Sequence, residues 1–240
     1  EPTLEGYERI FRNENIWIGY VNSAIYAAGG TIISLVLVIP FAFVISIKTF
    51  VLRRVLTTMM IIIWYFQGGL IPTYLVVRGL NLVNTRLAVM LIGAFGVWNV
   101  VIARTFFAHS IPKDLFEASL LDGSDHFTYF FRIVLPLSTA IIAVVALFVT
   151  VANWNDFFKN LVYITEESKF SLQLVLRSIL LEAQSISLEE QDVETVAQQL
   201  REAGLIRYGV IIVASVPMLV AYPFAQKYFV KGVLVGSVKG

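Results

Sequence analysis

The order of apolar and charged residues divides the chain into long uncharged runs separated by short polar connections. Five runs contain no Asp, Glu, Lys or Arg, at residues 15–47, 55–77, 87–103, 133–155 and 208–226. An α-helix rises about 1.5 Å per residue, so roughly 20 apolar residues cross the hydrocarbon core of a bilayer. The runs lack the two-residue alternation of barrel strands, and helices satisfy their own backbone polar groups in lipid. The pattern therefore predicts an all-α membrane protein, a polytopic transmembrane helix bundle with five visible spans.

Composition agrees with a membrane solvent, since 58% of the residues are hydrophobic and 15% are charged. A core helix of a soluble protein is an alternative for the run at 87–103 alone, but five such runs in one chain argue against it. The chain has no cysteine and two histidines, which argues against a thiolate or histidine metal site. A net charge of +1 gives no basic excess for nucleic acid.

Basic residues near the span ends set the predicted orientation. Those without neighbouring acids are Lys48, Arg53 and Arg54 after the first run, and Lys227, Lys231 and Lys239 after the last. The positive-inside rule places both groups in the cytoplasm, although Arg78 and Arg86 favour the opposite side. We therefore expect one transmembrane domain over residues 1–240. Its C-terminal tail and residues 109–135 lie inside, and the N-terminal segment and the loop at about 156–207 lie outside.

The cytoplasmic connection carries signals for a short helix. Ser110 is a candidate N-cap, Pro112 suits a first helical turn, and Asp114 would lie near the positive end of the helix dipole. Gly123 is placed to end the helix in a left-handed conformation.

Apolar residues at helical spacing within this short helix predict a contact surface. Leu115, Phe116, Ser119 and Leu120 would share one face, since residues three or four apart line up. Such a face on a cytoplasmic loop indicates a protein partner. The alternatives are that it lies on lipid headgroups or packs against its own bundle.

The stretch EASLLDGSDHFTYFFRIVLP resembles the EAA motif of binding-protein-dependent ABC importer permeases. The positions that meet this motif at its spacing are Glu117, Ala118, Gly123, Ile133, Leu135 and Pro136. Ser119 stands where a second alanine is usual, which is a small change in size.

Further segments are similar to the carbohydrate branch of that family, in the style of the smaller maltose permease subunit. They are GYVNSAIYA at 19–27, IPTY at 71–74, LNLVNT at 80–85, WNDF at 154–157 and QKYFVKGVLVGSVKG at 226–240. Two departures are Lys159 with Asn160 after WNDF, where many relatives have a proline, and the polar stretch at 182–207. Both favour a sub-branch that imports acidic oligosaccharides such as alginate or pectin fragments.

The resemblance implies the permease subunit of an ATP-driven ABC importer in the bacterial cytoplasmic (inner) membrane, forming the path for a sugar or oligosaccharide. It implies a type I permease bundle, with a sixth span preceding the part seen here. The expected partners are a second, different permease chain, a cytoplasmic ATPase dimer, an extracytoplasmic solute-binding protein and lipid.

The short helix would then be a coupling helix docked in a groove of the ATPase. The residues assigned to coupling are Leu115, Phe116, Glu117, Ala118, Ser119, Leu120, Asp122 and Gly123. The sequence has no G-x-x-x-x-G-K-[ST] loop to hold a nucleotide phosphate. We therefore expect this chain to bind no cofactor and not to be an enzyme, with ATP and magnesium held by the partner ATPase.

Polar and aromatic residues inside the apolar runs are candidates for the solute path, because polar groups that face lipid without a partner are costly. These are Trp64, Tyr65, Gln67, Gly68, Gly69, Trp98, Asn99, Asn153, Trp154 and Asn155. Alternatively, the glycines allow close helix packing and the aromatic residues anchor the membrane interface. The outer loop could be a platform for the binding protein or a plain connection.

Other functions make different demands on the sequence. A membrane-embedded enzyme needs acids, histidines or a nucleophile within its spans, whereas here the acids lie outside the runs and both histidines lie in the cytoplasmic connection. A passive channel needs no docking helix. Within transport, the runner-up is an ABC permease for amino acids or other small solutes.

Overall fold

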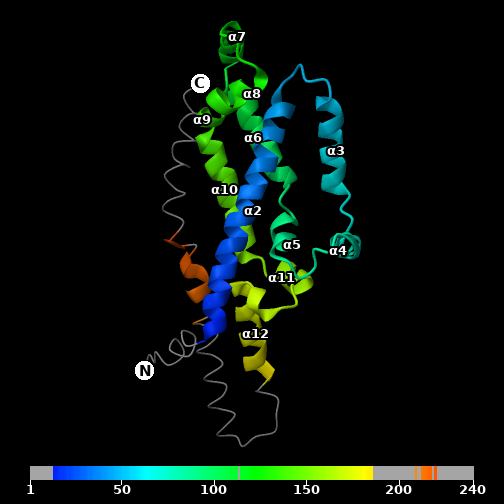
Figure 1. Cartoon of the computed structure of the whole chain (residues 1–240), viewed down its shortest axis with the longest axis vertical. Coiled ribbons are helices and arrows are strands. Elements are labelled where there is room, and N and C mark those ends of the chain that lie inside the picture. The colour runs from blue at the N-terminus through cyan, green and yellow to red at the C-terminus, as the bar shows by residue number, and fades with distance from the viewer. Residues whose placement is uncertain (1–12, 113, 186–208, 210–211, 218, 221–240) are drawn as a thin grey trace, which may run out of the picture. The chain divides into compact units, whose positions relative to one another are not determined.

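The first predicted span is one continuous helix. The computed structural model describes residues 13–112, 114–185, 209, 212–217 and 219–220, and all regular secondary structure there is helical (Figure 1). Helix α2 covers Glu14–Ser46, within one residue at each end of the predicted run. Among the described residues, it is the only unbroken helix long and apolar enough to cross a membrane.

The second predicted span is divided into two helices. Helix α3 covers Arg53–Tyr65 and α4 covers Leu70–Gly79, and their axes are bent by 115°. Gly69 has a φ of +79°, which L-residues with a side chain rarely adopt. The Thr73 hydroxyl donates a hydrogen bond to the Gly69 carbonyl over 2.7 Å and so fixes the start of α4. Figure 1 shows α4 turned away from the axis of α3.

The third and fourth runs are also interrupted. Helices α5 (Arg86–Leu91) and α6 (Val97–Ser110) share the third run, and Gly93 between them has a φ of +82°. The connection and the fourth run contain α7 (Asp114–Leu121), α8 (His126–Tyr129), the π-helix η1 (Phe130–Val134), α9 (Leu135–Leu137) and α10 (Thr139–Asn155). The segment ending at Leu137 is bent by 76° against α10. If each bent pair is one span, the described residues hold up to three spans.

After α10 the chain forms α11 (Phe158–Tyr163), the 3₁₀-helix η2 (Glu167–Lys169) and α12 (Leu172–Ser185). Within the fifth predicted run, residues 209, 212–217 and 219–220 are helical. The rest of that run, residues 1–12 and most of the polar stretch at 182–207 lie outside the described residues, as does the QKYFVKGVLVGSVKG segment.

The chain divides into two compact units, and each has its own core. Unit 1 comprises Glu1–Gly29, Val77–Met90 and Val151–Tyr222, and its core residues include Ile16, Trp154, Leu172 and Leu176. Unit 2 comprises Gly30–Val76, Leu91–Thr150 and Pro223–Gly240. Its core residues include Val38, Ala42, Ile45, Val100, Ala103, Phe107, Val134 and Val145.

Large apolar side chains are exposed along the first two runs. Ile32 and Val36 on α2 are 63% and 66% exposed, and Ile63 on α3 is 56% exposed. Many exposed large apolar side chains of this kind need lipid or another chain to cover them. Because the runs at 15–47 and 55–77 contain no charged residue, we expect lipid to contact this surface.

Candidate coupling helix and solute path

Helix α7 ends in a well-formed C-terminal cap at the glycine predicted to close it. Gly123 has a φ of +76°, which confirms the left-handed conformation expected there. The Gly123 amide donates to the Leu120 carbonyl over 3.0 Å, and the Ser124 amide donates to the Ser119 carbonyl over 2.9 Å. This pair of bonds is a Schellman motif, which satisfies carbonyls left free at the helix end. The last turn of α7 is therefore firmly closed.

The predicted start of this helix is wrong. Helix α6 continues through Ser110, so Ser110 is the last residue of α6 and not the N-cap of α7. Ile111 is extended, with φ −100° and ψ 113°, and Pro112 lies outside both helices. Proline disfavours the helical conformation in the residue before it, and Ile111 before Pro112 is extended, so the chain leaves α6 there. The next helix then begins at Asp114.

The two faces of α7 have different surroundings. Ser119 is 4% exposed, and its hydroxyl donates to the Phe116 carbonyl over 2.8 Å. The half-buried Phe116 ring contacts the rings of His126 and Tyr129 at centroid distances of 5.0 and 5.1 Å. Phe116 and Ser119 thus face their own chain. This agrees, for these two residues, with the alternative that the apolar face of the helix packs against its own bundle. The remaining predicted coupling residues do not face their own chain.

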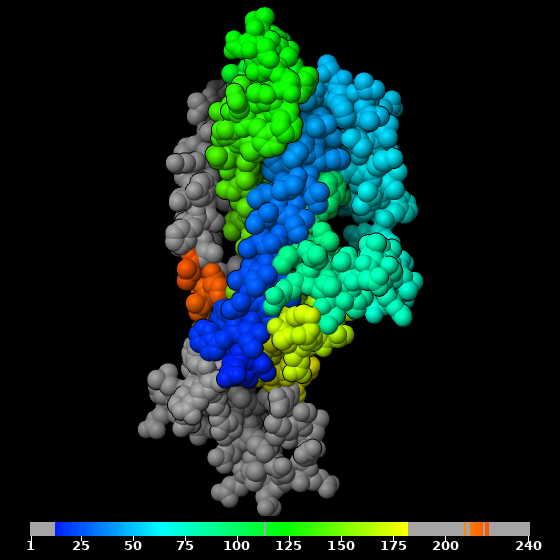
Figure 2. All heavy atoms as spheres, in the orientation of Figure 1, coloured from blue at the N-terminus to red at the C-terminus, as the bar shows by residue number. Residues whose placement is uncertain are grey.

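The outward surface of α7 combines apolar and acidic side chains. Leu115, Leu120 and Leu121 are 37%, 48% and 91% exposed. Glu117, Ala118 and Asp122 are exposed too, and Glu117 has no ion-pair partner within the described part of the chain. Figure 2 shows atoms of α7 that no other described segment covers in that view. Leu121 is the strongest candidate anchor that sequence reasoning missed, although its place beside Leu120 was visible.

A second cap fixes the turn that follows α7. Asp125 precedes α8, and its Oδ1 accepts a hydrogen bond from the Thr128 amide over 2.9 Å. Hydrogen bonds from Thr128 hold the pKa of Asp125 below its usual range. The Asp-x-x-Thr spacing is typical of an N-cap, so this residue could have been found from the sequence.

The candidate path residues of unit 2 include one aromatic pair. The rings of Trp64 on α3 and Trp98 on α6 meet edge to face, with centroids 5.9 Å apart and an interplanar angle of 79°. They are 42% and 58% exposed, and Tyr65 is 79% exposed. Asn99 lies beside Gly96, where an added Cβ would come within 2.9 Å of the Asn99 Nδ2. Gly96 therefore makes room for that amide.

Gln67, Gly68 and Gly69 lie together in the non-helical break between α3 and α4. An added Cβ would meet only Pro72 Cβ, 3.9 Å away, at Gly68 and nothing within 4 Å at Gly69. Close packing against the described residues therefore does not require these glycines. The positive φ of Gly69 shows instead that the backbone turn requires it.

The path candidates of unit 1 follow one another at the end of α10. Trp154 is 5% exposed, packs against Tyr20, and donates from Nε1 to the Ala214 carbonyl over 3.3 Å. The Asn155 side chain donates to the Val151 carbonyl of its own helix over 3.0 Å. Trp154 is thus a core residue of unit 1, and Asn155 is exposed.

Asn153 is the remaining candidate, and its side chain is bound by Lys159, one of the two residues that depart from the family pattern after WNDF. The Lys159 ammonium donates to Asn153 Oδ1 over 2.9 Å and pairs with Asp156 at 3.2 Å. The same Asp156 accepts from the Lys159 amide over 2.9 Å, at the start of α11. Lys159 therefore orders the polar end of α10 within this chain.

Two segments of the carbohydrate-branch pattern bind one loop of unit 1. Asn22, which is 1% exposed, donates to the carbonyls of Ser168 and Phe170 and accepts from Arg86 over 2.9 Å. Asn84 accepts at Oδ1 from the amides of Thr165 and Glu166, each over 3.2 Å. Sequence reasoning assigned no role to either asparagine. Their side chains hold the loop at 163–171 in place.

Known proteins resemble this chain over nearly its whole length. No protein-family model matches the sequence. The chain is 36% identical over 238 residues to the protein LplC of Bacillus subtilis (strain 168), covering 99% of this chain and 79% of LplC. It is 34% identical over 238 residues to the polygalacturonan/rhamnogalacturonan transport system permease protein YtcP of the same organism, covering 99% of this chain and 82% of YtcP.

A solved structure has the same fold. It is the crystal structure of a bacterial ABC transporter involved in the import of the acidic polysaccharide alginate, with a TM-score of 0.81 and 25% sequence identity. The match covers 93% of this chain and 79% of the chain in that structure.

The helical fold and these relatives define a membrane-integral component of a transport system rather than an enzyme. The chain belongs to the family of carbohydrate ABC transporter permeases.

Proposed function

We propose that this chain forms, together with a second and different permease chain, the path by which a sugar or oligosaccharide crosses the bacterial cytoplasmic membrane. The observation that supports coupling most directly is the outward surface of α7. Three exposed leucines, a Glu117 with no ion-pair partner among the described residues and a closed C-terminal cap suit a helix that inserts into a groove of another protein.

The partner in that groove would be an ATPase dimer, which would bind ATP and magnesium and perform the hydrolysis. Apolar anchors in a desolvated groove supply most of the binding free energy at such interfaces. Because the Phe116 ring packs α7 against Tyr129 and His126 of its own unit, the docked helix would move that unit as ATP closes the dimer. A solute-binding protein would deliver cargo at the opposite face of the membrane.

The names of two similar proteins support an acidic oligosaccharide as cargo. YtcP is named for polygalacturonan, a uronic acid polymer, and the solved transporter imports alginate. Within the chain, the Trp64 and Trp98 rings and the amides of Gln67 and Asn99 provide the mixture of apolar faces and hydrogen-bonding groups that sugars require.

The test is to replace the exposed leucines of α7. In the assembled transporter, Leu120→Ala with Leu121→Ala should lower both stimulated ATPase activity and uptake of a labelled galacturonate trimer by about tenfold or more, because two anchors are lost. Leu75→Ala on α4, where the side chain is 58% exposed, is the matched control and should leave both unchanged.

Unchanged ATPase stimulation and uptake in the double variant would overturn the proposed role of α7. Normal coupling to a neutral sugar with no galacturonate uptake would overturn only the choice of cargo.

A further inference from the structure

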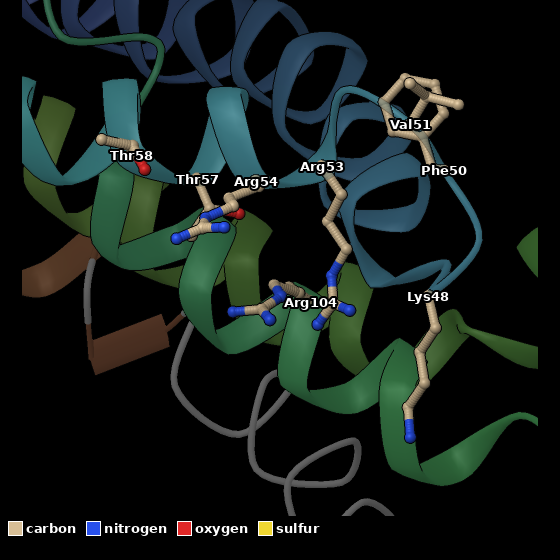
Figure 3. A pocket seen from close by; sticks show the side chains of 8 residues that line it. All are labelled: Lys48, Phe50, Val51, Arg53, Arg54, Thr57, Thr58 and Arg104. Atoms are coloured by element: carbon tan, nitrogen blue, oxygen red, sulfur yellow. The ribbon is translucent and has the colours of Figure 1, made fainter.

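A basic pocket lies in unit 2, and no residue of α7 lines it. Its volume is about 470 Å³, and its lining comes from the turn after α2, the first turns of α3, and α6. The lining residues are Lys48, Phe50, Val51, Arg53, Arg54, Thr57, Thr58 and Arg104. Figure 3 shows Arg53 and Arg54 extending from α3 toward Arg104 on α6.

Four cationic side chains share this space, and no acid among the described residues lines it. No Asp or Glu occurs between residues 15 and 113, so sequence neighbours cannot neutralise them. Within the described residues none of the four forms an ion pair. Arg53 is anchored by a 3.1 Å hydrogen bond from its Nε to the Ile45 carbonyl, which leaves its terminal nitrogens for another group. Four like charges held together favour a bound anion.

Two further features point to oxygen-rich anions. The Thr57 Oγ1 is buried and has no hydrogen-bond partner among the described atoms, so an acceptor in the pocket would satisfy its hydroxyl. Leu52 at the start of α3 gives no side-chain cap, so the positive end of that helix dipole also faces this region. Arginine forks match the oxygen geometry of phosphate.

The pocket also has an apolar side. Phe50 and Val51 line it, and Val51 is 89% exposed. The uncharged run that follows the arginines begins at Val55. The pocket therefore lies where charged residues give way to the apolar surface of α3, the depth at which phospholipid headgroups meet their acyl chains.

We propose that this pocket binds a phosphate group, carried by an anionic phospholipid or by a soluble phosphate compound at the membrane surface. Lys48, Arg53, Arg54 and Arg104 neutralise the phosphate, and Thr57 donates a hydrogen bond to it. The site is independent of cargo and of the α7 contact, so its test does not depend on either.

The test uses the purified complete transporter in detergent with two probes, dihexanoyl phosphatidylglycerol and inorganic phosphate, against chloride at equal ionic strength. The apparent Kd is taken from the rise in Tm with probe concentration. Arg54→Gln with Arg104→Gln should raise the Kd about tenfold or more, because two charge-assisted contacts are lost. Arg78→Gln, an exposed arginine on α4, should not change it.

The result identifies the source of the phosphate. Stabilisation by phosphatidylglycerol alone assigns the pocket to lipid, and stabilisation by inorganic phosphate as well assigns it to the phosphate group itself. The variant Arg54→Lys with Arg104→Lys keeps the charge and should retain most of the binding. The proposal is overturned if neither probe stabilises the wild type, or if wild type, double variant and Arg78→Gln respond equally.

Discussion

At the scale of single residues, two asparagines with left-handed backbone conformations differ in their side-chain contacts. Asn81 and Asn84 have φ values of 55° and 61°, and both lie in the LNLVNT segment. The Asn81 side chain makes no hydrogen bond among the described residues, whereas Asn84 binds the loop that follows α11 through its amide group. Sequence motifs mark both positions equally, because a pattern does not show which side chain finds a partner.

This pair provides a matched prediction. Asn84→Ala should lower the free energy of unfolding by about 0.5–1.5 kcal/mol more than Asn81→Ala, because it removes the side-chain acceptor of the exposed Thr165 and Glu166 amides. Both variants carry the same cost of a left-handed alanine, so that cost cancels. Urea unfolding of the purified chain in detergent measures the difference. Equal losses of stability would show that the loop does not depend on Asn84.

At the scale of helices, hydropathy predicted the apolar runs and missed the breaks within them. Helix α2 matches its run because nothing in it interrupts the backbone, apart from a tolerated Pro40. The second and third runs break where Gly69 and Gly93 take positive φ values, which a count of uncharged residues does not detect. The glycines were visible in the sequence, but their backbone conformation depends on the neighbouring helices.

The 163–171 loop carries a charge that predicts a pH dependence. The hydrogen bond from Lys169, with others from Ser168 and Asn84, lowers the pKa of Glu166 from 4.5 to about 2. A depressed carboxyl pKa contributes stability that is fully present above pH 4.5 and is lost as the pH falls from 4.5 toward 2. Glu166→Gln should therefore lower Tm by a constant amount above pH 5, and the difference should shrink below pH 4.5.

The neighbouring Glu167→Gln variant is the control for this measurement. Glu167 is exposed, and its side chain forms no hydrogen bond or ion pair among the described residues, so Tm at pH 7 should not change. A Tm difference for Glu166→Gln that stays constant down to pH 3 would contradict the assignment.

At the scale of the whole molecule, the side of the membrane at which each segment lies is open to a direct test. These 240 residues contain no cysteine, so single cysteines can be placed in them without removing others. Phe127→Cys, at a side chain that is 69% exposed, should react with a membrane-impermeant maleimide only after cells are permeabilised. Glu167→Cys should react in intact cells. The reverse labelling pattern would invert the proposed orientation.

The candidate sites were predicted to different degrees. The Gly123 cap followed from the sequence because a helix-ending glycine is a local signal. The inward orientation of Phe116 and the burial of Trp154 did not follow, because both depend on contacts with residues distant in the chain, such as Tyr129 and Tyr20. A local feature such as a helix cap can be predicted from a single sequence. Whether a side chain lies in the core or faces outward depends on tertiary packing.

The break between α3 and α4 has a consequence for the assembled transporter. Residues 66–69 interrupt an apolar run near its middle and are exposed in the single chain, so hydrogen-bonding backbone groups at the two helix ends are freed there. Hydrocarbon cannot hydrate such groups, and irregular backbone at that depth persists only beside protein or water. We therefore expect a neighbouring subunit or water to contact residues 66–69 in the assembled transporter, so that lipid does not enclose the chain there.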